Sequence, residues 1–120
     1  MPASSSSTPS DLYAYSLKPG APNNADYALL LTDHSLVQRD IHRTVSVLFL
    51  SNQVETRGAP TRVPIRAYPE GGLRLPNAHL FAVADVIFPL PLTLLGPNLG
   101  ALHPDDAEQV RAAVRMWLGL

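Results

Sequence analysis

Asp85 is the one ionisable residue in the apolar stretch FAVADVIF, which spans residues 81–88. A carboxylate among apolar side chains is costly to desolvate unless it is paired, hydrogen-bonded or exposed at a site. Asp85 can therefore act as a general base, or it can accept hydrogen bonds from backbone or arginine groups and orient a loop. Strand alternation predicts that Asp85 shares one face with Val83 and Ile87. The residues alone leave both interpretations open.

The composition argues against metal and disulfide chemistry. The 120 residues include no cysteine, which excludes disulfides and thiolate metal sites. The four histidines, at positions 34, 42, 79 and 103, lack the close spacing typical of a metal site on one element, so we expect no metal and no cofactor. The net charge of −1 and the 16% of charged residues give no basic excess that would hold a nucleic acid by counterion release.

The chain length predicts one domain that can fold alone and bury roughly two thirds of its unfolded surface. Residues 1–10 contain a Ser/Pro-rich run with nothing to bury, which predicts a disordered tail before a domain at residues 11–120. No basic and apolar signal sequence follows Met1, and no apolar run approaches the roughly 18 residues that a membrane span needs. We therefore expect a cytoplasmic protein that does not contact the membrane.

The elements that must position Asp85 are short strands at roughly even spacing. The hydrophobic pattern predicts strands at residues 12–17, 27–32, 44–50, 61–65 and 80–88, with a further short strand at residues 73–75. Pro64 favours an edge position for its strand, because proline cannot donate a hydrogen bond to a neighbouring strand. Residues 89–100 are apolar, but their three prolines forbid a long helix.

The C-terminal segment is predicted to be a helix. Pro104 suits the first helical position, and acidic residues follow in the first turn, where the helix dipole favours negative charge. One apolar stripe is expected to lie on the sheet: Ala107, Val110, Val114, Trp117 and Leu118. The sequence therefore predicts a mainly β fold with a C-terminal helix (α+β), in which a small barrel is closed by that helix.

Several segments occur in an order that resembles the MazF/PemK family of toxins from bacterial toxin-antitoxin operons. They are DLYAYSLKPG, YALLLTDHSLVQ, VLFLSN, RGAPTRVPI, FAVADVIF and LGALHPDDAEQVRAAVRMWLGL. The resemblance implies an SH3-like β-barrel of the MazF/CcdB type that forms a homodimer and cleaves single-stranded RNA without a metal. It also implies a cognate antitoxin, whose peptide lies across the active site and silences the toxin.

RNA cleavage of this kind needs a base for the 2′-hydroxyl proton, a cation for the phosphate and an acid for the leaving oxygen. By resemblance, Asp85 matches the acidic residue that serves as the base in some family members. Ser51, in FLSN, stands where the family has a hydroxyl residue that can bond a phosphate oxygen. Arg57 and Arg62 flank GAP in the loop that contacts RNA in the family, and a charged surface loop is the other interpretation.

The family's catalytic arginine has no counterpart in the first alignment, which places Asp26 or Tyr27 at its position. An alternative alignment of IHRTVSVLF, residues 41–49, makes Arg43 the catalytic cation. The arginine that precedes the family's aspartate is Val83 here. The observation that decides whether the site can work is therefore whether Arg43, Arg57 or Arg62 comes within reach of Asp85 and Ser51 in a concave groove.

Two other functions stay open. The chain can be a catalytically degenerate member that binds an antitoxin, gyrase or another partner through an apolar surface around FPLPLTLL, residues 88–95, or it can be an unrelated small β domain. The terminal MWLGL resembles the end of the gyrase-poisoning CcdB toxins, but Trp117 lies on the apolar stripe and is predicted to be part of the core.

Overall fold

The computed structural model describes residues 12–22, 25–32, 44–52, 60–75 and 80–120. The elements in these ranges are β1 (Tyr13–Leu17), β2 (Tyr27–Leu30), β3 (Thr44–Ser51), β4 (Arg62–Ile65), the 3-10 helix η3 (Pro69–Gly71), β5 (Leu80–Pro91), the 3-10 helix η4 (Leu92–Leu94), β6 (Leu95–Ala101) and α3 (Pro104–Leu118). The predicted tail at residues 1–10, and Arg43 and Arg57, lie outside the described residues.

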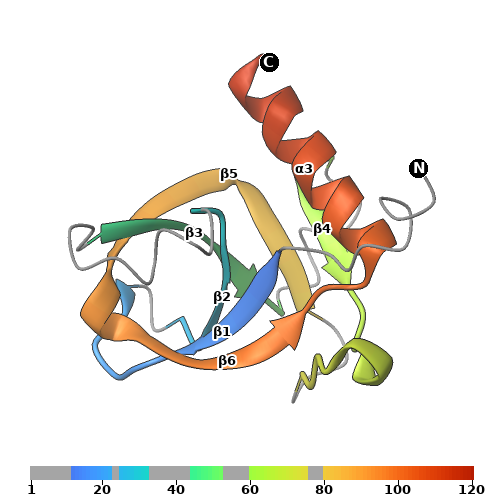
Figure 1. The fold of residues 1–120 in the computed structure, drawn as a ribbon. Coiled ribbons are helices and arrows are strands. Elements are labelled where there is room, and N and C mark those ends of the chain that lie inside the picture. Colours follow the sequence, from blue (N-terminus) through green and yellow to red (C-terminus); the bar gives the residue numbers. More distant parts are fainter. Residues whose placement is uncertain (1–11, 23–24, 33–43, 53–59, 76–79) are drawn as a thin grey trace, which may run out of the picture.

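The six strands form one sheet in the order β4-β5-β3-β2-β1-β6, and every neighbouring pair is antiparallel. The sheet curls on itself, so that β5 and β6 lie on opposite sides of the molecule and are joined at one corner through η4 (Figure 1). The predicted mainly β fold with a C-terminal helix is confirmed.

The two edges of the sheet are brought together by the chain that follows β4. The amide N–H of Arg74 donates to the carbonyl oxygen of Leu99 on β6 at 3.2 Å. Gly100 on β6 has a φ of +120°, and a Cβ placed on it would lie 2.5 Å from the carbonyl oxygen of Gly72. Only glycine permits this close approach of two backbones, so Gly100 is where the curled sheet closes.

The buried side chains form two clusters on opposite faces of the sheet, as strand alternation requires. Along β2, Leu29 belongs to the first cluster, whereas Ala28 and Leu30 belong to the second. The helix α3 contacts β4 and β5 and adds three side chains to the first cluster: Ala107, Val110 and Ala113. The helix therefore completes this core, as the sequence predicts.

The helix begins and ends with local signals. The N–H of Asp105 donates to Nδ1 of His103 at 3.1 Å, so His103 caps the first turn, and Pro104 follows it at the start of the helix. The prediction that Trp117 is part of the core is wrong, because 54% of its surface is exposed. The last turn of α3 projects beyond the sheet (Figure 1), so its apolar side chains have no strand to pack on.

The predicted strands are confirmed for β1 to β5, and β4 is an edge strand, as Pro64 indicates. Strand β6 is not predicted, because Gly96 and Pro97 interrupt its pattern. Both residues lie where the register between β1 and β6 shifts, and β6 is the other edge of the sheet, so a missing N–H is tolerated. At residues 73–75, only Leu73 pairs, in an isolated bridge with Tyr68.

Candidate active site

Arg62 on β4 and Asp85 on β5 form an ion pair, with Nη1 of the arginine donating to Oδ1 of the aspartate. Nη1 of Arg62 also donates to the hydroxyl oxygen of Thr61 at 3.0 Å. The two charged side chains are 18% and 25% exposed, so both reach solvent while most of their surface is covered. The predicted need for a cation beside Asp85 is therefore met by Arg62.

The pair lies where β5 departs from β3. Leu48 pairs with Ile87 and Leu50 pairs with Ala82, so one residue of β3 faces four residues of β5, 83–86. On its other side, β5 pairs with β4 over residues 80–83. Val83, at the start of the bulge, stands opposite Arg62, and the N–H of Ala84 is bonded to the carbonyl oxygen of Thr61 at 2.9 Å. Bulges of this kind often re-aim a side chain at an active site, and this one turns the Asp85 carboxylate toward the edge strand.

Ser51 lies on the same face of the sheet as the ion pair but in a different row. It stands opposite Phe81, which also stands opposite Pro64, whereas Arg62 stands opposite Val83. Phe81 precedes Asp85 by four positions on β5, and the start of the bulge lies between them. The structure thus pairs Arg62 with Asp85 and places Ser51 opposite Phe81 in the same sheet.

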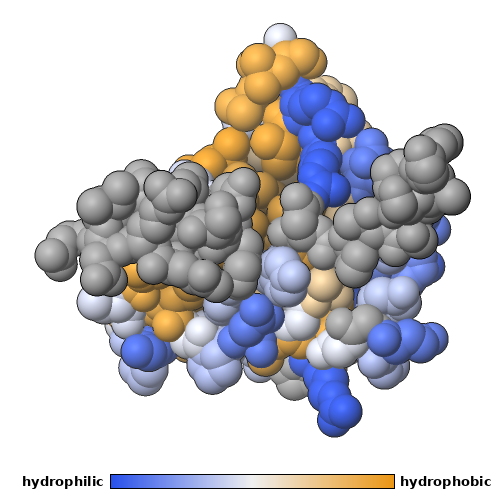
Figure 2. All heavy atoms as spheres, in the orientation of Figure 1, coloured by the Kyte–Doolittle hydropathy of each residue, from blue (hydrophilic) through white to orange (hydrophobic). Residues whose placement is uncertain are grey.

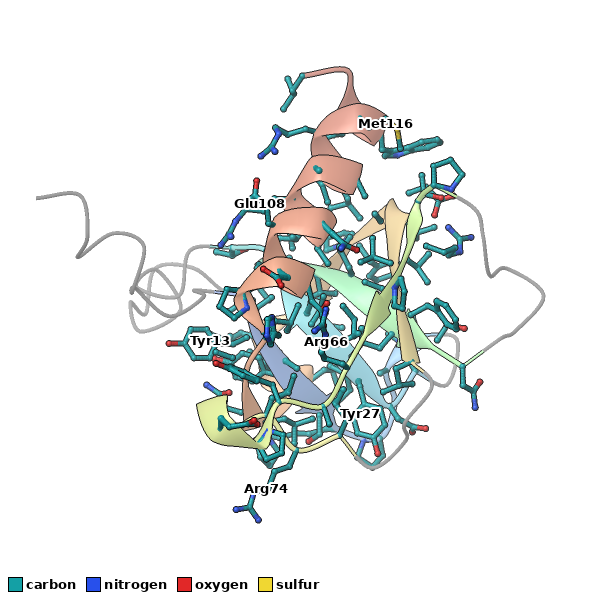
Figure 3. The ribbon with its side chains drawn as sticks, turned by 90° about the vertical axis from the view of Figure 1, so that its right-hand side faces the viewer. Tyr13, Tyr27, Arg66, Arg74, Glu108 and Met116 are labelled. Carbon is teal, nitrogen blue, oxygen red and sulfur yellow. The ribbon has the colours of Figure 1, made fainter. Side chains whose placement is uncertain are left out.

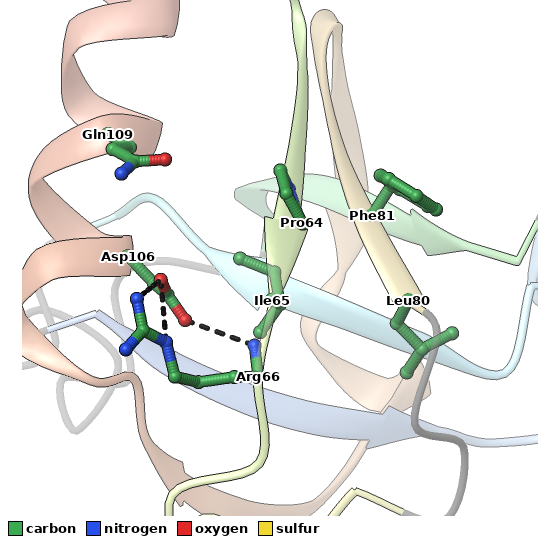
Figure 4. A pocket seen from close by; sticks show the side chains of 7 residues that line it. All are labelled: Pro64, Ile65, Arg66, Leu80, Phe81, Asp106 and Gln109. Atoms are coloured by element: carbon green, nitrogen blue, oxygen red, sulfur yellow. Dashed lines mark hydrogen bonds and ion pairs between the residues drawn. The ribbon is translucent and has the colours of Figure 1, made fainter. Parts of the chain in front are cut away.

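A cavity lies between α3 and the β4–β5 pair. It is a cavity of about 300 Å³ lined by Pro64, Ile65, Arg66, Leu80, Phe81, Asp106 and Gln109 (Figure 4). Its walls are mostly apolar, and its polar groups come from the end of β4 and the first turns of α3. This cavity could not be predicted from the sequence, because its lining residues come from three separate segments.

Asp106 is the only buried charged residue in the described part of the chain, with 3% of its surface exposed. Its carboxylate accepts three hydrogen bonds from Arg66: from the backbone N–H at 3.0 Å, from Nε at 3.2 Å and from Nη2 at 3.0 Å (Figure 4). Sequence reasoning placed acidic residues in this turn for the helix dipole alone. The sequence feature that corresponds to this ion pair is Arg66, which directly follows the strand predicted at residues 61–65.

Among the described residues, five large apolar side chains are exposed: Val86 on β5, and four that gather at the C-terminal end of α3 (Figure 2). Met116 and Trp117 are each 54% exposed, Leu118 is 51% exposed and Leu120 is 86% exposed. Met116 lies at the opposite end of the molecule from Arg74 (Figure 3). In the predicted apolar surface at residues 88–95, Leu90 is buried, and Phe88, Leu92, Leu94 and Leu95 are partly exposed while packing on the second core cluster.

Among the described residues, no three histidine, aspartate or glutamate side chains gather closely enough to hold a metal ion. The one α-helix in the same ranges, α3, is too short and too polar to cross a membrane.

No family model matches the sequence, and no curated protein matches it. Solved structures do match. An endoribonuclease in complex with its cognate antitoxin, from Mycobacterial species, is 23% identical, with a TM-score of 0.69 over 94% of this chain and 97% of that one. The Mycobacterium tuberculosis toxin MazF-mt6 is 23% identical, with a TM-score of 0.66 over 94% and 98% of the two chains.

A MazE–MazF structure from Deinococcus radiodurans is 15% identical, with a TM-score of 0.66 over 94% of this chain and 97% of that one. These matches extend over nearly the whole of both chains, which excludes a likeness limited to one hairpin or to the helix. Together with the curled six-stranded sheet and its terminal helix, they show that this chain has the MazF-type toxin fold.

Proposed function

We propose that this protein is a MazF-type toxin that cleaves single-stranded RNA at a site built around Arg62 and Asp85. The observation that carries the proposal is the ion pair between these residues at the bulge of β5, in a chain with the fold of MazF toxins. A cation and a carboxylate on neighbouring strands supply two of the three groups that RNA cleavage requires. Structures described as endoribonucleases share this fold.

In the proposed mechanism, an RNA phosphate replaces Asp85 as the partner of Arg62. The guanidinium then neutralises the charge that develops on the phosphate oxygens, and it can do so with two parallel hydrogen bonds. The released Asp85 carboxylate accepts the 2′-hydroxyl proton as the ribose oxygen attacks phosphorus. The bond from phosphorus to the 5′-oxygen breaks, a water molecule protonates the departing oxygen, and a 2′,3′-cyclic phosphate remains. The ion pair thus holds both groups in position before RNA binds.

The other predicted residues keep supporting roles in this proposal. Ser51 stands opposite Phe81, four positions before Asp85 on β5, and in this proposal its hydroxyl binds another phosphate oxygen of the RNA. Arg43 remains the predicted second cation, and Arg57 a predicted RNA contact; both lie outside the described residues. No cofactor or metal takes part.

The proposal extends to partners and setting. An antitoxin is expected to bind the toxin domain at residues 11–120 and block the site, because a structure with this fold is described as a complex with its cognate antitoxin. We also propose a homodimer that acts in the cytoplasm. Each of these statements follows from the toxin assignment and fails with it.

The experiment that tests the function is induced expression in a bacterium, with growth and total RNA followed together. We expect growth arrest accompanied by RNA decay, and we expect Asp85→Asn to abolish both. Glu70→Gln is the matched control, because it neutralises an exposed carboxylate on η3, which carries no residue of the candidate site, and should leave both effects intact. Normal growth with intact RNA in the wild type would contradict the proposal.

One observation favours a second function, that of a binding module without catalysis. Four apolar side chains, those of Met116, Trp117, Leu118 and Leu120, are exposed together at the end of α3. An exposed apolar patch of this kind is typical of a protein interface. Under this alternative, growth arrest occurs with intact RNA, is unaffected by Asp85→Asn and is lost in Trp117→Ser.

A further inference from the structure

We propose that the cavity between α3 and the β4–β5 pair holds one nucleotide of the RNA strand, next to the nucleotide that meets Arg62 and Asp85. This inference depends on the proposed function only in naming RNA as the polymer that binds. The site itself is argued from the size, lining and position of the cavity.

The cavity has the dimensions and walls of a small binding site. Its volume of about 300 Å³ lies at the lower end of the range typical of ligand pockets. Pro64, Leu80 and Phe81 give it apolar walls of the kind against which unstacked bases pack in single-stranded RNA complexes.

The polar groups of the cavity are suited to a nucleotide. Arg66 directs Nε and Nη2 to Asp106, and within the described ranges Nη1 has no hydrogen-bond partner. The Arg66 side chain is 54% exposed, so this donor is accessible to a phosphate oxygen. The amide of Gln109 lines the cavity from α3, also without a partner among the described residues, and it offers a donor and an acceptor to the edge of a base (Figure 4).

The position of the cavity connects it to the ion pair. Pro64 follows Arg62 by two residues on β4, and Phe81 precedes Asp85 by four residues on β5, so the same two strands form both features. Two residues of strand span about 7 Å, which an extended nucleic acid backbone covers in one nucleotide step. A strand of RNA whose phosphate meets Arg62 therefore brings a neighbouring base to the cavity.

A peptide is the other class of occupant, and the edge of β4 argues against it. An extended peptide would add to the sheet through backbone hydrogen bonds with this edge. Pro64 has no N–H to donate, and the N–H of Arg66 already donates to Asp106. With two successive donors of the edge missing, β4 cannot hold a peptide strand, whereas a nucleotide needs none of these groups.

The test is a titration of the full chain with each of the four nucleoside 5′-monophosphates, followed by the NMR shifts of backbone amides and of the Gln109 side-chain amide. We expect shifts at Phe81, Arg66 and Gln109, and an affinity about three- to tenfold weaker in Gln109→Leu for the base that binds best. Ala112→Leu, which places the same side chain at an exposed position of α3 away from the cavity lining, should bind like the wild type.

The outcomes separate this inference from the proposed function. Nucleotide shifts at the cavity without RNA cleavage would support the nucleotide site and contradict only the nuclease. RNA cleavage that keeps its base preference in Gln109→Leu, with no nucleotide shifts at the cavity, would overturn the nucleotide site alone. Shifts at the cavity with a short peptide of glutamate and leucine, and not with nucleotides, would also overturn it and assign the site to a protein partner.

Discussion

Arg62 on β4 and Asp85 on β5 pair at the point where β5 leaves its register with β3. The two residues are 23 positions apart in the chain, and the bulge at residues 83–86 lies between the part of β5 that pairs with β4 and the part that pairs with the first half of β3. Without the extra residues of the bulge, the carboxylate would follow the regular alternation of a flat strand. The candidate site is therefore a product of sheet curvature.

A double-mutant cycle with Arg62→Gln and Asp85→Asn measures how strongly the two charges interact. We expect a coupling of about 1–2 kcal/mol in the free energy of unfolding from urea titrations, because both side chains are largely covered. Glu108 and Arg115 on α3 form the control pair, more than half exposed and 3.7 Å apart, with an expected coupling of about 0.5 kcal/mol or less. Equal couplings for the two pairs would contradict a built site.

Asp106→Ala should destabilise the protein by roughly 2–4 kcal/mol, measured as the free energy of unfolding. The substitution removes the acceptor of three hydrogen bonds from Arg66 and leaves the Arg66 N–H at the edge of β4 without a partner. Asp105→Ala is the matched control in the same helical turn, with a side chain that is 73% exposed, and it should cost less than about 1 kcal/mol. Similar losses in both variants would show that only the helix dipole matters here.

Gly100→Ala should cost about 3 kcal/mol or more, because the new Cβ would meet the backbone of Gly72 at 2.5 Å and the φ of +120° is itself strained. Gly20→Ala separates these causes: Gly20 also has a positive φ, of +98°, but a Cβ there meets nothing within 4 Å. We expect a loss of about 1–2 kcal/mol for the Gly20 variant. Thermal unfolding of the two variants makes the comparison, and equal losses would mean that the barrel is not closed at Gly100.

The ionisation of Tyr15 should make the stability of the protein depend on pH in the alkaline range. Burial raises the pKa of its hydroxyl above the ordinary tyrosine value of 10.0, and the neighbouring Tyr13 raises it further. The folded state thus holds this proton at a pH where the unfolded state has released it, so stability is complete below about pH 10 and falls as the pH rises above it.

The alkaline loss should be smaller in Tyr15→Phe when unfolding by urea is compared at pH 8 and above pH 10. Ser16→Ala, at the next residue of β1, changes no titratable group and should leave the loss unchanged. An identical alkaline decline in the Tyr15 variant and the wild type would show that another group causes it.

Much of the fold could be predicted because local signals and the final structure agree. The β-branched run of β3 and the acidic, proline-initiated start of α3 each form the element that their own residues favour. Strand β6 could not be predicted, because Gly96 and Pro97 break its pattern and its place at the sheet edge is a tertiary property. The prediction that Trp117 belongs to the core was wrong for a related reason. Helical periodicity indicates on which face of the helix a side chain lies, but it does not show where the sheet beneath that face ends.

The candidate site was predictable in part. Asp85 stood out as a lone carboxylate in an apolar strand, and its partner Arg62 was one of three arginines considered. The choice among them depended on which strand lies beside β5, and that pairing is not local. The cavity of Arg66, Phe81 and Gln109 gave no sequence signal at all, because each residue is ordinary within its own element.

The most direct test of the account is the rate at which purified protein cleaves an unstructured, end-labelled RNA of mixed sequence without added metal. The account predicts cleavage by the wild type, an unchanged rate in Glu70→Gln, and a rate lower by about 10²- to 10⁴-fold in Asp85→Asn, as expected for the loss of a general base. Intact RNA with the wild-type protein, or equal cleavage rates for the wild type and Asp85→Asn, would contradict it.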